Sequence, residues 1–133
     1  MPSNTSALNS YNSAINTAQS NYNQSINNNK SSFTQNAGTS LSNYNTSINS
    51  ALTAYNAVIN NPNTTAQQAQ QALQTYNQAS QGALTNYNTN INGTGTNYNQ
   101  STNNALQNYN QAAATALSNY TSSINKPSTT SGS

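Results

Sequence analysis

Aromatic residues recur along this chain every eleven residues, and this interval limits its fold more than any other feature. They form two sets of five: Tyr11, Tyr22, Phe33, Tyr44 and Tyr55, then Tyr76, Tyr87, Tyr98, Tyr109 and Tyr120. A strand would place residues eleven apart on opposite faces, because its side chains alternate. An α-helix completes about three turns in eleven residues and returns them to one face. The interval therefore predicts helix.

Three smaller columns accompany the aromatic residues. Leucine stands three residues before the aromatic residue in seven of ten repeats, alanine four before it in seven, and isoleucine four after it in six. At about 100° per residue, these positions lie within about 60° of the aromatic residue, and the asparagines beside it project to either flank. We expect a helix–helix interface formed by Leu8, Tyr11, Ile15, Tyr22, Ile26, Phe33, Leu41, Tyr44, Ile48, Leu52, Tyr55, Ile59, Leu73, Tyr76, Leu84, Tyr87, Ile91, Tyr98, Leu106, Tyr109, Leu117, Tyr120 and Ile124.

The repeat slips by one residue in the middle of the chain, where a proline stands. Asn61, Pro62 and Asn63 predict a turn, because proline cannot continue a helix interior and disfavours helical backbone at the residue before it. Either Asn63 or Thr64 is expected to cap the second helix, whose first turn holds Gln67. The predicted fold is all-α: a long antiparallel helix-turn-helix hairpin of ten eleven-residue repeats, five in each arm.

These signals divide the chain into five segments. We expect an N-terminal extension at 1–4, a helical arm at 5–60, a turn at 61–63, a second helical arm at 64–125 and a flexible tail at 126–133. The tail has the sequence KPSTTSGS, and such small polar residues are typical of mobile chain ends.

Folding the arms about the turn also predicts which residues meet. A tight turn at Pro62 pairs residues whose numbers sum to about 124, so that Tyr76 meets Ile48 and Tyr98 meets Ile26. Each aromatic residue would then face the smaller column of the other arm, which suits the packing of large side chains against small ones.

The composition indicates that a single hairpin lacks stability. Only 32% of the residues are hydrophobic, and 68 of the 133 are Asn, Ser or Thr. Ordering the backbone costs about 1–2 kcal/mol per residue, which so thin an apolar stripe does not offset. Lys30 and Lys126 are the only charged side chains, so little repulsion opposes association. We therefore expect the partner to be the chain itself, in a multi-helix bundle or filament.

The residue types that are missing exclude several functions. The chain has no Asp, Glu, His or Cys, which leaves no acid–base pair, thiolate or metal ligand set, so neither enzymatic activity nor a cofactor is expected. Two lysines are too few to bind nucleic acid. No apolar stretch approaches the ~20 residues of a transmembrane helix. Folding should be nearly insensitive to pH, because almost nothing apart from the chain ends titrates between about pH 3 and 9.

Glycans are possible partners of the chain. Eight Asn-x-Ser/Thr sequons permit surface glycosylation, at Asn4, Asn23, Asn29, Asn45, Asn63, Asn92, Asn99 and Asn119. With 30 Asn and 38 Ser or Thr residues, chance alone produces about as many, so the sequons permit glycans without indicating them.

The leading functional hypothesis is a structural, non-enzymatic subunit that self-assembles through the Leu/Tyr/Ile stripe into an extracellular or virion-surface fibre or filament. An amphipathic coat on lipid surfaces is an alternative, since uncharged repeats of this kind can lie on lipid packing defects. A prion-like disordered segment is another, because Asn, Gln, Ser and Tyr are its typical residues.

An ice-binding protein is the last alternative. The eleven-residue period, the alanine column and the Thr and Asn content resemble the helical type of fish antifreeze protein, and the resemblance implies an ice-binding face. It concerns period and composition only, because no column of this chain is consistently threonine.

Overall fold

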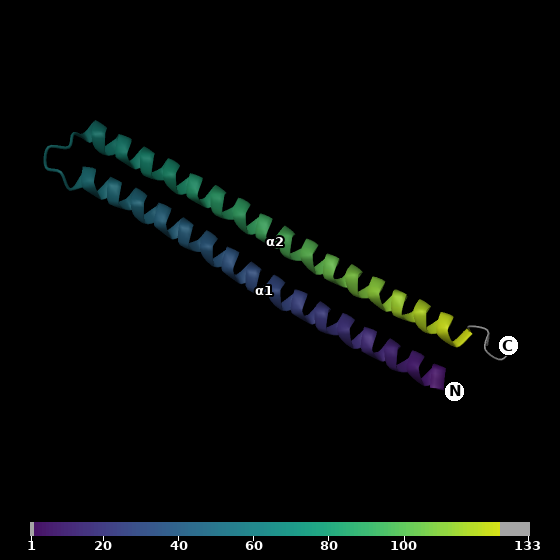
Figure 1. Cartoon of the computed structure of the whole chain (residues 1–133). Helices are drawn as coiled ribbons and strands as arrows, with labels where there is room; N and C mark the ends of the chain where they lie inside the picture. Colours follow the sequence, from purple (N-terminus) through teal and green to yellow (C-terminus); the bar gives the residue numbers. More distant parts are fainter. Residues whose placement is uncertain (1, 126–133) are drawn as a thin grey trace. The chain divides into compact units, whose positions relative to one another are not determined.

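The computed structural model describes residues 2–125, which form two long helices (Figure 1). Helix α1 spans Pro2–Ile59 and helix α2 spans Ala66–Asn125. The helices pack against each other through pairs of aromatic rings. The prediction of an all-α chain is confirmed, and the packed antiparallel segments are those of a helical hairpin.

The helix bounds differ slightly from the predicted arms. Helix α1 begins at Pro2, so residues 2–4, predicted as an extension, are helical. Proline suits this place, because the first residue of a helix has no intrahelical partner for its N–H. Helix α1 ends at Ile59 and α2 begins at Ala66, which makes the connection longer than the predicted 61–63. The predicted flexible tail, 126–133, lies outside the described residues.

The chain forms two compact units. The turn-proximal unit consists of Ser31–Tyr98 and contains the connection between the helices. The terminal unit consists of Met1–Lys30 and Asn99–Ser133. Each unit contains part of α1 and part of α2, and each has its own buried residues and aromatic pairs.

The connection turns the chain at the predicted proline. The Asn63 N–H donates to Oδ1 of Asn61 over 3.0 Å, a local turn in which an asparagine side chain replaces a backbone acceptor. The Asn61 N–H donates to the carbonyl of Val58 over 3.2 Å, and the hydroxyl of Thr64 donates to the same carbonyl. Two of these bonds therefore meet at one carbonyl near the end of α1.

Helix α2 begins with a capping box. The Gln68 N–H donates to Oγ1 of Thr65 over 3.2 Å, and the Thr65 N–H donates to Oε1 of Gln68 over 3.0 Å. This reciprocal pair satisfies two backbone donors at the start of the helix. The prediction of Asn63 or Thr64 as the cap was wrong, because the Thr64 hydroxyl is already bound to the end of α1.

A column of small residues is the most buried part of each unit. In the terminal unit it comprises Ala7, Ala18, Ala105 and Ala116, and in the turn-proximal unit Ser40, Ala83 and Thr94, all between 5% and 8% exposed. Every one stands four residues before an aromatic residue. No large side chain among the described residues is fully buried. The hairpin thus has a narrow seam rather than a broad core.

Aromatic rings pair across the seam of both units. The ring centroids lie 5.5–6.0 Å apart in five pairs, with the planes tilted by 48–64°. The pairs are Tyr11–Tyr120 and Tyr22–Tyr109 in the terminal unit, and Phe33–Tyr98, Tyr44–Tyr87 and Tyr55–Tyr76 in the turn-proximal unit. Edge-on and tilted contacts of this kind are favourable because they bring a ring edge against a ring face.

The observed register differs from the predicted one. The residue numbers of every aromatic pair sum to 131, so the expectation of about 124, with aromatic residues facing isoleucines, was wrong. Side chains on a helix lean toward its N-terminus. Because the two helices are antiparallel, the two rings of a pair lean toward each other along the helix axes. Counting residues from the turn does not include this axial shift of the rings.

Candidate functional site

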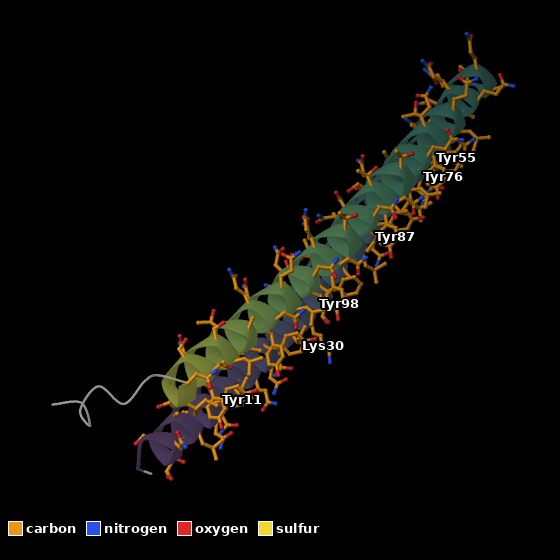
Figure 2. All side chains as sticks on the ribbon, turned by 90° about the vertical axis from the view of Figure 1, so that its right-hand side faces the viewer. Tyr11, Lys30, Tyr55, Tyr76, Tyr87 and Tyr98 are labelled. Carbon is orange, nitrogen blue, oxygen red and sulfur yellow. The ribbon has the colours of Figure 1, made fainter. Side chains whose placement is uncertain are left out.

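The three columns of the predicted interface have different positions in the structure. The aromatic column forms the cross-seam pairs. Most of the isoleucine column is partly buried beside it, namely Ile15, Ile26, Ile48 and Ile91, while Ile59 and Ile124 near the helix ends are exposed. Figure 2 shows Tyr55 and Tyr76 side by side in the turn-proximal unit.

The leucine column lies outside the seam of the hairpin. All seven leucines are exposed, by 42% to 55%: Leu8, Leu41, Leu52, Leu73, Leu84, Leu106 and Leu117. A regular column of half-exposed large side chains leaves apolar surface in contact with water. Their predicted role in helix–helix contact therefore stays a prediction, and it concerns contacts beyond this hairpin.

Shallow grooves between the helices define one face of each unit. In the terminal unit, a groove of about 390 Å³ is lined by Ser10 and Ala14 of α1 and by the equivalent Asn119 and Ser123 of α2. These residues stand one before and three after an aromatic residue. Equivalent positions of the two helices therefore lie on the same face of the unit.

The turn-proximal unit has the same arrangement. Its groove of about 210 Å³ is lined by Asn43 and Ser47 of α1 and by the equivalent Asn86 and Asn90 of α2. Both grooves are lined by small and polar residues and by tyrosines. We call this side of each unit the groove face.

The leucines of both helices lie together on the face opposite the groove. Around each helix axis, the groove positions lie on one side of the aromatic column. The leucine position lies on the other side, about 60° from the aromatic residue. Because equivalent positions share a face, the two leucine columns of a unit share one as well. This leucine face comprises Leu41, Leu52, Leu73 and Leu84 in the turn-proximal unit, and Leu8, Leu106 and Leu117 in the terminal unit.

The two units differ in what interrupts the leucine column. In the terminal unit, Gln19 and Lys30 occupy leucine positions, and both are exposed. Figure 2 shows the Lys30 side chain projecting away from the ribbon. In the turn-proximal unit the only interruption is Gly95, which carries no polar side chain. The turn-proximal unit therefore has the more continuous apolar face.

Three polar atoms in the seam are buried without a hydrogen-bond partner among the described residues. They are Nδ2 of Asn29 and Oγ1 of Thr102 in the terminal unit, and Oγ of Ser80 in the turn-proximal unit. By contrast, the Ser40 hydroxyl donates to the carbonyl of Asn36 over 3.0 Å. Buried polar groups without partners destabilise a fold. Because its amide nitrogen is buried, Asn29 is also a poor acceptor for a glycan in the folded chain.

The sequence interpretation missed that the alanine column forms the seam. Its signal was present, since alanine stands four residues before the aromatic residue in seven of ten repeats. Alanine at the point of closest approach lets two helices pack closely. Close approach at the alanines leaves the leucines at the side of the contact, where they remain exposed.

The surface offers apolar contact and hydrogen bonding as its main means of recognition. Within residues 2–125, no helix is long and apolar enough to cross a membrane. The same residues contain no cluster of three potential metal ligands. No protein-family model, curated protein or solved structure matches the chain.

Proposed function

We propose that this protein is a structural, non-enzymatic subunit that self-assembles into a fibre or filament outside a cell or on a virion surface. The observation that carries the proposal is the leucine face, which gathers the exposed leucines of both helices on one side of each unit. In the sequence, leucine occupies this position in seven of the ten eleven-residue repeats.

The narrow seam supports the proposal that the hairpin is stabilised by partners. The most buried residues are alanine, serine and threonine, which bury little apolar surface, and two of the three buried atoms without partners lie in the terminal unit. Full burial of a leucine contributes about 1.5–3 kcal/mol, and each leucine here is only about half buried. Covering the leucine face would supply the stabilisation that the hairpin lacks.

A second copy of the chain is the partner that fits this face best. Neighbouring leucines such as Leu41 and Leu52 stand eleven residues apart, which is about 16 Å at a rise of 1.5 Å per residue. A second copy has the same spacing, so its leucines can fit between those of the first. Lys30 is the only charged side chain among residues 2–125, which leaves little for a charged partner to bind.

The proposal is tested by circular dichroism and sedimentation velocity over about a hundredfold range of concentration, with electron microscopy of the concentrated samples. We expect helicity and sedimenting mass to rise together, and elongated particles to appear. A chain that stays a stable helical monomer throughout would contradict self-assembly.

Substitutions separate the leucine face from general effects on the helices. We expect association to be lost when Leu41, Leu52, Leu73 and Leu84 are all replaced by serine. The matched control replaces four exposed asparagines, Asn45, Asn56, Asn77 and Asn88, by serine and should associate as the unsubstituted chain does. Equal loss in both variants would show that the leucines have no special role.

A coat on a lipid surface is the second candidate function, because the same leucine face could insert between lipids. The turn-proximal part of this face carries no basic residue, so it would favour uncharged lipids over anionic ones. Flotation with phosphatidylcholine vesicles tests this candidate. Binding that the four leucine substitutions abolish, together with a monomeric chain in solution, would favour the lipid coat over self-assembly.

A further inference from the structure

Tyrosine is the dominant oxidisable side chain of this protein. The sequence contains nine tyrosines, one methionine and no cysteine, tryptophan or histidine. The methionine is Met1, at the start of the chain. A one-electron oxidant that meets this protein therefore has few side chains other than tyrosine to attack.

The structure places eight of the nine tyrosines in pairs. Four pairs join α1 to α2, with ring centroids 5.7–6.0 Å apart: Tyr11–Tyr120, Tyr22–Tyr109, Tyr44–Tyr87 and Tyr55–Tyr76. All eight tyrosine residues are partly exposed, which leaves them open to oxidants in solution. The ninth tyrosine, Tyr98, lies against Phe33, which has no hydroxyl group.

We propose that the four tyrosine pairs are cross-linking sites at which a haem peroxidase with hydrogen peroxide, or an equivalent one-electron oxidant, forms dityrosine between the helices. Each phenol of a pair loses one electron and one proton to become a phenoxyl radical. The two radicals join through a carbon–carbon bond between ring positions next to the hydroxyls. The two ring hydrogens at the new bond then move to the oxygens, which restores both phenols. The two electrons and two protons reduce one hydrogen peroxide to two waters.

Proximity favours coupling within the hairpin over coupling between molecules. Holding two reacting groups in contact can correspond to a very high effective concentration, far above that of a dilute protein solution. The paired rings are already in contact, whereas rings of different molecules must first meet. The paired rings belong to one chain, so this coupling does not depend on self-assembly.

The cross-links would hold the two helices of the hairpin together. Tyr11–Tyr120 would close a loop of most of the chain, and Tyr55–Tyr76 a short loop around the connection. Because the chain has no cysteine, it cannot use disulfides for this purpose. Dityrosine would give a structural subunit covalent links that thiol reductants do not break.

A single trypsin site provides a direct test of the terminal pairs. Trypsin cuts after Lys30, and Lys126 is protected because Pro127 follows it. Cleavage separates Tyr11 and Tyr22 from the rest of the chain, so the two fragments stay joined on a denaturing gel only if a cross-link connects them. We expect the oxidised chain to stay joined after cleavage, and the untreated chain to separate.

Matched variants identify the pairs that react. Replacing both Tyr109 and Tyr120 by phenylalanine should abolish the joining of the fragments, because Tyr11 and Tyr22 lose their partners. The control variant, Tyr44→Phe with Tyr55→Phe, should keep the fragments joined. Peptide mass spectrometry should find the four predicted links, each with a loss of two hydrogens, and Tyr98 uncoupled. The Phe33→Tyr variant should add a fifth link, to Tyr98.

Oxidation of an equal mixture of isotope-labelled and unlabelled chains, at low concentration, distinguishes links within a chain from links between chains. We expect links within one chain. Such links are recognised because both linked peptides carry the same type of label. The proposal is overturned if the linked peptides are mostly of mixed label, if Tyr98 couples as often as the other tyrosines, or if the pattern equals that of the chain oxidised in denaturant. The absence of dityrosine after oxidation would overturn it as well.

Discussion

The two compact units share one helical pattern but differ in where they are weak. The turn-proximal unit has the capping box, the bonded connection and four leucines on its exposed face, and it also contains four glycines within its helices: Gly38, Gly82, Gly93 and Gly95. The terminal unit has no glycine among its described residues, but it contains two buried polar atoms without partners. Backbone freedom mainly weakens the turn-proximal unit, which has one unsatisfied polar atom, at Ser80, whereas the terminal unit is weakened by two such atoms.

This difference shows that substitutions within a repeating sequence can change local stability without changing the fold. Polar residues replace leucine only in the terminal unit, at Gln19 and Lys30, whereas alanine is replaced in both units, by Asn29 in the terminal one and by Ser40 and Thr94 in the turn-proximal one. We expect the turn-proximal unit to resist hydrogen exchange more strongly, because its local bonds hold the two helices at the connection.

Overpacking the seam is expected to have the largest effect. Replacing Ala83 by leucine inserts a large side chain where only 6% of the residue is exposed, and should lower the free energy of unfolding by about 1–3 kcal/mol. Ala105→Leu tests the same change in the terminal unit. Denaturant unfolding measures both, and Gln81→Leu, at an exposed position, is the control. Equal stability of Ala83→Leu and the control would contradict the close approach of the helices at the alanine column.

Removing the unsatisfied polar groups should stabilise the terminal unit. Asn29→Ala with Thr102→Val takes away both of its buried polar atoms without partners and should raise the free energy of unfolding by about 1–2 kcal/mol. Backbone amides of the terminal unit should become more protected from hydrogen exchange. The difference in protection between the two units should therefore become smaller. Asn28→Ala, beside the first site but exposed, serves as the control. A destabilised double variant would mean that these groups have partners in solution.

Loss of the capping box should weaken the turn-proximal unit. Thr65→Ala removes the oxygen that accepts the Gln68 N–H and should cost about 1 kcal/mol. Thr65→Ser keeps an oxygen at this place and should restore most of the stability. Thr53→Ala, at an exposed position inside α1, should be neutral or slightly stabilising. Thermal unfolding followed by circular dichroism compares the three variants, and an equal melting temperature for Thr65→Ala and Thr53→Ala would contradict the role of the cap.

A single glycine substitution should have the smallest effect. A Cβ at Gly82 would meet no atom within 4 Å, so Gly82→Ala should stabilise α2 by about 0.5–1 kcal/mol through its better helix propensity. The change should appear in thermal unfolding at low concentration. Destabilisation that appears only at high concentration would indicate that a second copy packs against the backbone at Gly82.

Sequence periodicity predicted the helices and the turn because both depend on local chemistry. The interval of eleven requires a helix, and proline at position 62 stops one. The capping residue was misplaced because several Thr and Asn residues follow one another there, and the choice among them depends on which one the end of α1 already binds. Thr64 donates to the Val58 carbonyl, which leaves Thr65 to cap α2.

Some features were decided only when the two helices packed together. The eleven-residue pattern places Leu, Ala, Tyr and Ile in one stripe on each helix. It did not determine which part of the stripe faces the other helix, because that depends on how closely the helices approach. Close approach buries the alanines and leaves the leucines exposed, and the lean of the side chains pairs aromatic with aromatic at a sum of 131. Local chemistry determines a helix, whereas the rotation and axial shift of one helix against another depend on all the side chains that meet.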